Sequence, residues 1–599
     1  MILQALTNYY HRLDGEGRVA PPGFKRVEIP FLIVLDKKGN FAGLHDTRTP
    51  FGKKNVAQSF TVPAERGRSG SKAWQVANLL WDHYGYVLGW PKSDSEKDRH
   101  MAKQQHDTFK AEIAKLREAI PGDSGGELVH RFIEQGDFAA VFNHPDWENC
   151  RKVPGCNLSF IVQGETRLVC QSELVTSYVA SASVSGSGEE EESAGQESLM
   201  EGFCMVTGEY GQVARLHPRT PIPGAKSNAK IVSFQKNMGF DSYGKEQSYN
   251  APTSVKTAFC YTTALNELLA KNSRQKLQVG DATTVFWAGE KNEIEDVFAD
   301  IFGESAKENP EQATKAIRVL YEAPKAGALP FVDDLTRFYV LGLAPNAARI
   351  AVRFWHAGTV GEAATNIMAH FDDTDIVHAG HQQPHCSLNE LLAATAVETK
   401  DIKKTNRVYS KGKYYDVEPN LAGETMKAIL SGAPYPQTLL AAAIRRCRAE
   451  REITYPRAAL IKAVLARAAR FYQQPEKEVG KDMDKENTNI GYRLGRLFAT
   501  LEKIQEEASP GINATIRDRF YGAASGTPVA AFPHLMKLKN HHLGKLESRG
   551  RAVNLEKIIT EIMGGIADFP THLSLQDQGR FAVGYYHQRQ DFFTKHETN

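Results

Sequence analysis

The sequence predicts an α+β protein, in which an N-terminal mixed α/β region with antiparallel strands precedes a C-terminal all-α helical bundle. Strand and helix patterns alternate irregularly up to about residue 360, which argues against a doubly wound parallel sheet. After residue 385 the strand patterns disappear, and apolar residues recur at the helical spacings of three and four. A chain of 599 residues is also too long for one ordinary core and predicts two to four domains.

The composition is that of a soluble globular protein, with 41% hydrophobic and 24% charged residues. No apolar run reaches the length of a membrane helix, and the amphipathic N-terminus lacks the pattern of a signal peptide. Seven scattered cysteines, without a Cys-x-x-Cys pair, indicate a reduced compartment, so we expect a cytoplasmic protein without a membrane partner. The net charge is only +2, so a nucleic-acid surface requires local clusters of cations.

The N-terminal segment predicts a helix followed by a hairpin. One helical stripe holds Ile2, Leu6, Tyr9 and Leu13. Further along, we expect a hairpin of strands 29–35 and 41–44, two helices in 99–137, a hairpin of 158–162 and 167–170, and strands at 204–206, 283–287, 338–343 and 349–354. The acidic, low-complexity segment 181–198 predicts a disordered surface excursion.

The C-terminal part predicts helices throughout. Residues 439–470 form two helices divided at Pro456, with eight basic residues against two acidic ones, and Arg445 and Arg448 are candidates for contact with nucleic acid. A polar linker at 475–485 precedes an up-and-down bundle with helices at 489–507, 513–523, 534–545, 553–563 and 575–594. We therefore expect three regions, 1–385, 386–480 and 481–599.

A first basic cluster falls between residues 52 and 72, where five cations oppose the single acid Glu65. Its flexible, hydroxyl-rich composition suits contact with phosphates. An ordinary solvated loop is the alternative. The cations are Lys53, Lys54, Arg66, Arg68 and Lys72.

The stretch 231–269 joins a polar, glycine-containing loop to a helix that carries one apolar stripe. Glycine permits close backbone approach to a ligand, and amide and ammonium groups donate hydrogen bonds without a shifted pKa. A structural loop that touches no ligand is again the alternative. The candidate binding residues, with those just before the loop, are Lys226, Asn228, Lys230, Gln235, Lys236, Asn237, Tyr243, Lys245 and Asn250. Thr253 or Ser254 is expected to cap the helix.

Motifs for chemistry are mostly missing from the sequence. It contains no phosphate-binding loop of the Gly-x4-Gly-Lys-Ser/Thr type and no Gly-x-Ser-x-Gly elbow. The most metal-like group is His378, His381, His385 and Cys386, which lies in a polar stretch without a second ligand pair. We therefore predict no catalytic residue, metal or cofactor. A metal-dependent nuclease that uses the region of Asp372 and His378 remains the alternative.

Several stretches resemble, in order, the large subunit of the type I-C CRISPR surveillance complex, often called Cascade. They are MILQALTNYYHRL at residue 1, CMVTGEYGQVARLHP at 204, SFQKNMGFDSYGKEQSYNAP at 233, TTVFWA at 283, FYVLGLAPNAARIAVRFW at 338, YPRAALIKAVLAR at 455 and RFAVGYYHQRQDFF at 580. The resemblance runs from residue 1 to about 593, and it is this order and coverage that make it specific.

The resemblance implies a non-catalytic subunit that reads a protospacer-adjacent motif in double-stranded DNA, helps open the duplex and holds the displaced strand. It implies as partners a guide RNA, the target DNA, the backbone subunits, a small subunit and a helicase-nuclease that docks later. In relatives the small subunit arises from an internal start, for which Met483 is a candidate here. A scaffold that binds only proteins is the third class of function left open.

Overall fold

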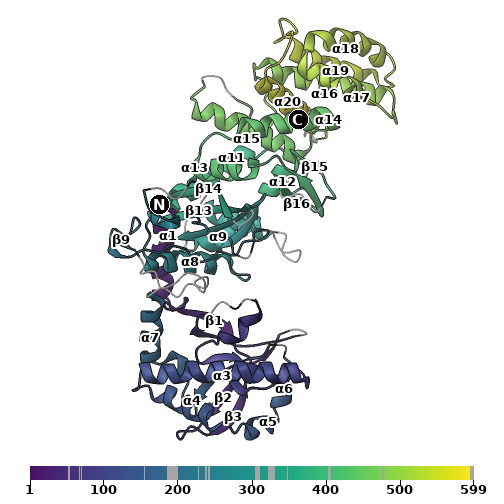
Figure 1. Ribbon diagram of the computed structural model, residues 1–599. Coiled ribbons are helices and arrows are strands. Elements are labelled where there is room, and N and C mark those ends of the chain that lie inside the picture. The colour runs from purple at the N-terminus through teal and green to yellow at the C-terminus, as the bar shows by residue number, and fades with distance from the viewer. Residues whose placement is uncertain are drawn as a thin grey trace. The chain divides into compact units, whose positions relative to one another are not determined.

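The computed structural model describes residues 1–51, 54–65, 68, 70–153, 155–184, 200–226, 228–235, 239, 243–303, 311–321, 331–346, 349–401, 406–474 and 478–593. The chain divides into two compact units (Figure 1). Unit 1 comprises residues 1–220 and 230–267, and unit 2 comprises residues 221–229 and 268–599. The predicted α+β class is confirmed, whereas the regions expected at 1–385, 386–480 and 481–599 stay predictions.

Unit 1 is built on a four-stranded sheet in the order β3-β2-β8-β7. Its members are β2 (Phe31–Leu35), β3 (Phe41–Asp46), β7 (Trp81–His83) and β8 (Asn157–Val162). β2 pairs antiparallel with β3, as the hairpin pattern predicted, and parallel with β8. The second predicted hairpin is wrong, because Ile161 and Leu168 form only an isolated bridge and β8 pairs with β2 and β7 instead.

Helices complete unit 1. The two helices predicted within 99–137 are α3 (Glu96–Ala119) and α4 (Ser124–Gln135). The N-terminal α1 (Ile2–Gly15) buries Leu6, Tyr9 and Leu13 of its predicted stripe and half-buries Ile2. Its Tyr10 ring meets the Phe259 ring of α8 (Val255–Leu269) edge-on at 5.8 Å. The remaining elements are β1 (Phe24–Glu28), β4 (Thr49–Phe51), β5 (Lys54–Val56), β6 (Ser59–Pro63), α2 (Tyr84–Leu88), α5 (Ala139–Phe142), α6 (Trp147–Arg151), α7 (Glu173–Val184), β9 (Glu201–Phe203) and β10 (Tyr210–Gln212). The strand predicted at 204–206 is wrong, because β9 ends at Phe203 and the chain then turns.

Unit 2 begins with an antiparallel sheet in the order β11-β12-β13-β14. These strands are β11 (Lys276–Val279), β12 (Ala282–Ala288), β13 (Arg337–Asn346) and β14 (Arg349–Thr359), and every residue of β12 is buried. The Phe286 and Phe298 rings lie 4.6 Å apart and join the sheet to α9 (Ile294–Phe302). The other helices of this part are α10 (Gln312–Tyr321) and α11 (Val360–Thr374).

Strands continue past residue 385, so the expectation that they disappear there is wrong. β15 (Val397–Glu398), β16 (Arg407–Ser410) and β17 (Lys413–Asp416) form an antiparallel sheet in the order β15-β17-β16. The three strands are only two to four residues long, and sequence periodicity is weak over so few residues. This sheet packs beside α12 (Leu388–Ala393) through the buried Val408.

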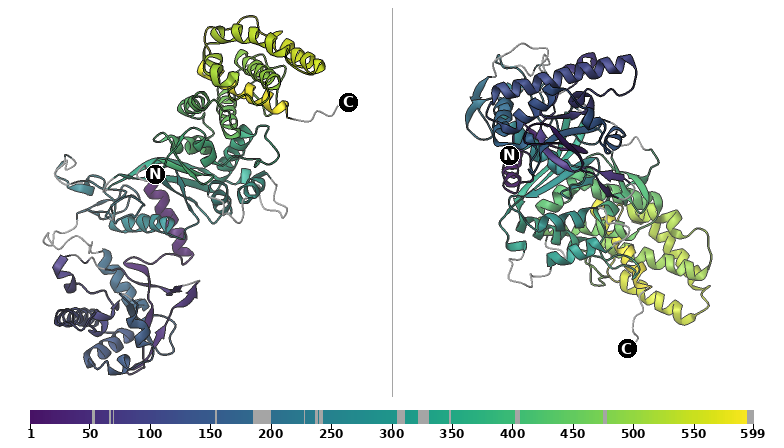
Figure 2. Two further views of the ribbon diagram at one scale, coloured as in Figure 1. Left: turned by 90° about the vertical axis from the view of Figure 1, so that its right-hand side faces the viewer. Right: turned by 90° about the horizontal axis from the view of Figure 1, so that it is seen from below.

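The C-terminal helices confirm the predicted bundle (Figure 2). They are α13 (Leu421–Ser431), α14 (Gln437–Glu450), α15 (Tyr455–Phe471), α16 (Ile490–Ala508), α17 (Ile516–Gly526), α18 (Pro528–Leu543), α19 (Arg549–Met563) and α20 (Leu575–Asp591). α16 and α20 are in backbone contact through glycines. A Cβ atom on Gly495 would lie 2.0 Å from the Phe581 carbonyl oxygen, and one on Gly584 would lie 2.2 Å from the Tyr492 carbonyl oxygen. Among the described residues, no helix combines the length and the apolar character needed to span a bilayer.

The glycine contact between α16 and α20 generates a stability prediction. We expect Gly495→Ala to lower the free energy of unfolding by about 1–3 kcal/mol, because the added methyl group has no free space and the helices must separate. Gly522→Ala in α17 is the matched control, since no atom lies within 4 Å of its Cβ position. That change should raise stability by up to about 1 kcal/mol through helix propensity. Urea unfolding compares the two variants, and equal stabilities would contradict the contact.

Candidate nucleic-acid interface

The first basic cluster is only partly described. Lys53 and Arg66 lie outside the described residues, as does the side chain of Lys54. Lys72 is exposed in a short 3-10 helix, Gly70–Gln75, and remains available to a ligand. Lys72 and Arg68 are therefore the two cations of this cluster whose side chains are described, and Lys72 is the exposed one.

Arg68 is engaged inside unit 1. Its guanidinium forms a two-point ion pair with the carboxylate of Asp82, whose side chain is 1% exposed. The same group donates to the Val76 carbonyl at 2.7 Å and lies over the Tyr86 ring at 4.1 Å. A phosphate would have to compete with a buried carboxylate for this guanidinium, so the geometry favours a structural role for Arg68.

The base of the signature loop, residues 231–254, is held by hydrogen bonds. The Asn250 side-chain amide donates to the carbonyls of Lys245 at 2.9 Å and Gln247 at 3.2 Å. Arg215 donates to the side-chain oxygen of Gln247 at 2.8 Å. Ser254 accepts from the backbone N–H of Thr257 at 3.2 Å and caps α8. Asn250 thus serves as a turn former here, as the structural alternative expected.

The α8 stripe that follows is buried and anchors the loop. Tyr261 and Leu265 are fully buried, and the Tyr261 hydroxyl lies 2.5 Å from Nδ1 of His217. Burial and, to a smaller degree, the charge of Lys230 lower the pKa of His217 to about 4, so this pair stays neutral near pH 7. A neutral, well-packed base gives the loop a fixed attachment.

The exposed part of the loop carries the remaining candidates. Tyr243 is 99% exposed and has a φ of 54°, beside Gly244 with a φ of 71°. Gln235 and Lys245 are also exposed, whereas Lys236 and Asn237 lie outside the described residues. A left-handed backbone at a non-glycine residue is uncommon and holds the tyrosine ring out in solvent. The described loop therefore presents an amide, a ring and an ammonium group on a fixed base.

The residues just before the loop are divided between the units. Lys226 and Asn228 are exposed and belong to unit 2, whereas Lys230 is half-buried and belongs to unit 1.

The basic stretch 439–470 exposes only half of its eight cations, which are Arg445, Arg448, Arg451 and Arg470. Arg457, Lys462 and Arg467 are buried, and Arg446 and Arg457 both pair with Glu450. Arg445 and Arg448 are exposed, although Arg445 pairs with Glu418 at 2.9 Å. Lys462, Arg467 and Arg470 stabilise the junction of α11, α13 and α15, a role that composition cannot distinguish from binding.

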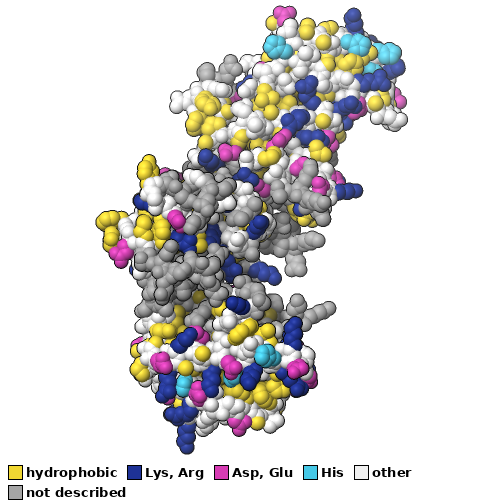
Figure 3. Space-filling view, in the orientation of Figure 1, with side chains coloured by type: hydrophobic (Ala, Val, Ile, Leu, Met, Phe, Trp, Pro, Cys, Tyr) yellow, Lys and Arg dark blue, Asp and Glu magenta, His cyan; other side chains and the backbone are white. Residues whose placement is uncertain are grey.

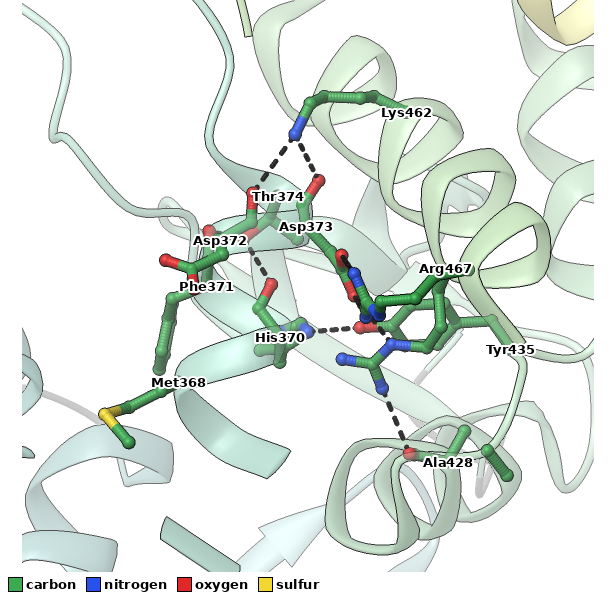
Figure 4. Close-up of polar contacts among 12 residues, drawn as sticks. Met368, His370, Phe371, Asp372, Asp373, Thr374, Ala428, Tyr435, Lys462 and Arg467 are labelled. Atoms are coloured by element: carbon green, nitrogen blue, oxygen red, sulfur yellow. Dashed lines mark hydrogen bonds and ion pairs between the residues drawn. The ribbon is translucent and has the colours of Figure 1, made fainter. Parts of the chain in front are cut away.

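Figure 4 shows this junction around Asp373 at the end of α11. Nε of Arg467 donates to the Asp373 carboxylate at 2.7 Å, and Arg470 donates to both its oxygens at 2.8 and 2.9 Å. Lys462 donates to the backbone carbonyls of Asp372 and Asp373, where the negative end of the helix dipole favours a cation. Asp373 is 3% exposed and Arg467 1% exposed, so the pair is shielded from water.

The histidine next to this pair is part of the same buried network. Nδ1 of His370 lies 2.6 Å from the Tyr435 hydroxyl, and the Arg467 guanidinium lies over the Tyr435 ring at 4.4 Å. Burial, with the Arg467 charge, lowers the pKa of His370 to about 3. The imidazole is therefore neutral near pH 7 and supports the tyrosine.

The residues of the nuclease alternative do not come together. His378 packs edge-on against the Tyr455 ring at 5.1 Å, and His385 packs against the Phe371 ring at 5.3 Å. Burial raises the pKa of Cys386 to about 12, which disfavours the thiolate that binds metals. Within the described residues no group of three His, Cys, Asp or Glu side chains is placed to hold a metal ion.

A cationic surface that the sequence analysis did not single out lies where α18 ends and α19 begins. Dark-blue and cyan side chains gather over these helices in Figure 3. Lys537, Lys545, Arg549 and Lys557 are exposed and form no ion pair with the described residues, and His534 and His541 are exposed beside them. Their even spacing among apolar residues resembles an ordinary amphipathic helix. No sequence signal separates them from paired cations, because pairing depends on the tertiary structure.

Comparison with known families gives one match. A family model described as CRISPR-associated protein (Cas_Csd1) matches residues 6–593. The matched range includes the anchored loop, the α11–α15 junction and the helical bundle, so it does not depend on one motif. No curated protein matches the chain.

The buried ion pair at Asp373 generates a second stability prediction. Asp373→Asn keeps the side-chain shape but leaves Arg467 charged and buried, and breaking one partner of a buried pair costs about 3–5 kcal/mol. Asp375→Asn is the matched control, because its pair with Lys481 is exposed and an exposed pair contributes about 0–1 kcal/mol. Urea unfolding at neutral pH measures both. A similar small loss for the two variants would show that Asp373 does not hold the junction together.

Proposed function

The chain belongs to the Cas_Csd1 family of CRISPR-associated proteins, and we propose that it is the non-catalytic large subunit of a type I-C RNA-guided surveillance complex. In this proposal the subunit reads a protospacer-adjacent motif in double-stranded DNA, helps open the duplex and holds the displaced strand. It associates with the guide RNA, the backbone subunits and a small subunit, and supports recruitment of a helicase-nuclease. Such a division of labour leaves the long sequence to base pairing and the short motif to protein.

The observation that carries the proposal is the signature loop with its fixed base and exposed residues. Gln235 can donate to and accept from base edges, whereas Lys245 offers only donors. Tyr243 holds a fully exposed ring beside them, suited to contact the first opened base pair. A purely structural loop would not need to hold an aromatic ring in solvent through a strained backbone.

The cations of α18 and α19 support the strand-holding part of the proposal. Unpaired lysine and arginine side chains attract a polyanion by releasing its counterions, and they give no sequence preference. A duplex motif reader and a sequence-neutral cationic surface are the two components that the proposed activity requires. A scaffold that binds only proteins needs no such cationic surface unless its protein partners are acidic.

The loop generates a prediction about motif discrimination. In the assembled complex, we expect Gln235→Ala and Tyr243→Ala to bind guide RNA normally but to lose discrimination between flanking motifs, by about 1–3 kcal/mol for a base-edge contact. A target library with randomised flanking sequences measures this loss. Tyr210→Ala is the matched control, because Tyr210 is an exposed tyrosine of the same unit outside the loop. If the loop variants fail to assemble, or discriminate like wild type, another segment reads the motif.

The cationic surface generates a prediction about salt. We expect replacing Lys537, Lys545 and Arg549 with Ala to weaken DNA binding for all sequences and to reduce the slope of log K against log salt by about one per lost phosphate contact. Titrations at several salt concentrations measure the slope. A wild-type slope near zero would favour the scaffold class, and cleavage of labelled DNA by the isolated chain with Mg²⁺ or Mn²⁺ would favour the nuclease class.

A further inference from the structure

The small sheet β15-β17-β16 has an unusual distribution of side chains for a sheet on the surface of a domain. Its inner face is anchored, because Val408 is buried and Tyr415 packs against the same core. Its outer face presents rings to solvent, with Tyr409 39% and Tyr414 44% exposed. Solvent-facing positions of a half-buried sheet are normally polar, so two neighbouring exposed tyrosines on this face require an explanation.

The two rings are directly opposed across the strand pair. The register aligns Tyr409 with Tyr414, and their ring centroids are 5.0 Å apart. The Arg407 guanidinium lies over the Tyr414 ring at 4.7 Å, which adds a planar cation to the pair. Tyrosine rings and guanidinium planes are the groups on which unstacked bases of single-stranded nucleic acids stack.

The charge around the rings fits the same ligand. The described residues of 397–416 include the cations Lys400, Arg407, Lys411 and Lys413, against Glu398, Asp401 and Asp416. Lys411 pairs with Glu390 at 3.0 Å and Lys413 with Glu398 at 2.7 Å, and both lysines remain more than half exposed. Exposed ion pairs of this kind contribute little to stability, so a phosphate can replace the carboxylate at little cost.

The turn between β16 and β17 has a lysine at a position where Asn or Asp would make the turn more stable. Ser410 and Lys413 are paired, so Lys411 and Gly412 form a two-residue turn, with φ angles of 48° and 83°. Such a turn prefers Asn or Asp followed by Gly. Lysine is unfavourable in the left-handed region, and here it places a cation at the end of the aromatic face.

We propose that the outer face of β16 and β17 binds single-stranded nucleic acid, with bases stacked on Tyr409 and Tyr414 and a phosphate held by Lys411. This inference rests on the proposed function, because it adds a second surface for a strand that the complex has separated. Duplex DNA does not suit this face, since stacked and paired bases do not expose their faces to an aromatic side chain.

The test uses the full-length chain and two fluorescent probes, a mixed-sequence single strand and a duplex of the same length. We expect Tyr409→Leu/Tyr414→Leu to weaken single-strand binding about tenfold or more, because stacking on an aromatic ring contributes about 1–3 kcal/mol per base, and to leave duplex binding unchanged. Tyr409→Phe/Tyr414→Phe keeps both rings and should bind like wild type. Lys411→Asn suits the turn better, so it should melt no lower than wild type while reducing the single-strand salt slope by about 0.7.

Several results would overturn the inference. Wild-type single-strand binding by the Leu pair, equal loss for both probes, or a loss in the Phe pair as large as in the Leu pair would exclude base stacking. If the Leu pair binds the strand normally but no longer co-purifies with other subunits, the face is a protein-docking surface. A wild-type complex that binds no target DNA would refute the proposed function itself, whereas target binding with an inert tyrosine pair would refute only this inference.

Discussion

In unit 2, one carboxylate at the end of α11 organises the arrangement of three helices. Asp373 is buried, and two arginines of α15 meet it while Lys462 of the same helix binds the last carbonyls of α11. Arg467 also donates to the Ala428 carbonyl of α13 at 3.1 Å. Desolvating these charges is unfavourable unless each finds its partners, so the network tolerates little change in how the helices pack. The helices that follow are thereby fixed to the sheet that precedes α11.

Several cations of this protein form ion pairs inside the fold, so a basic segment of the sequence need not offer its charge to a ligand. The stretch 439–470 is the most basic of the segments that the sequence analysis considered, yet its buried arginines and lysine stabilise the junction. Arg68 similarly closes a contact with the buried Asp82 in unit 1. Exposed cations without acidic partners also lie over α18 and α19, where the local sequence is less basic. Local composition therefore shows where the charged residues lie in the sequence, but not whether they are exposed to bind a nucleic acid.

The exposed aromatic residues likewise project into solvent from well-packed segments. Tyr243 projects from a loop whose base is held by Asn250, Arg215 and the capped α8. Tyr409 and Tyr414 project from strands whose opposite face is buried against α12. In both places a well-packed support holds a ring in water. Fixing the ring in advance reduces the entropy lost on binding, which is how a small surface gains affinity.

The sequence alone determined the α+β class, the capped helix after the signature loop and the helices of the bundle, because their apolar spacing extends over many residues. It also indicated a CRISPR-associated family, through motifs distributed from one end of the chain to the other. It missed the sheet β15-β17-β16, whose strands are too short for a clear period, and it predicted a hairpin where β8 instead pairs with the distant β2. Only the tertiary structure decided which arginines, tyrosines and lysines face solvent. Exposure depends on partners far apart in the chain, such as Asp373 for Arg467 and Glu390 for Lys411, and local spacing contains no information about them.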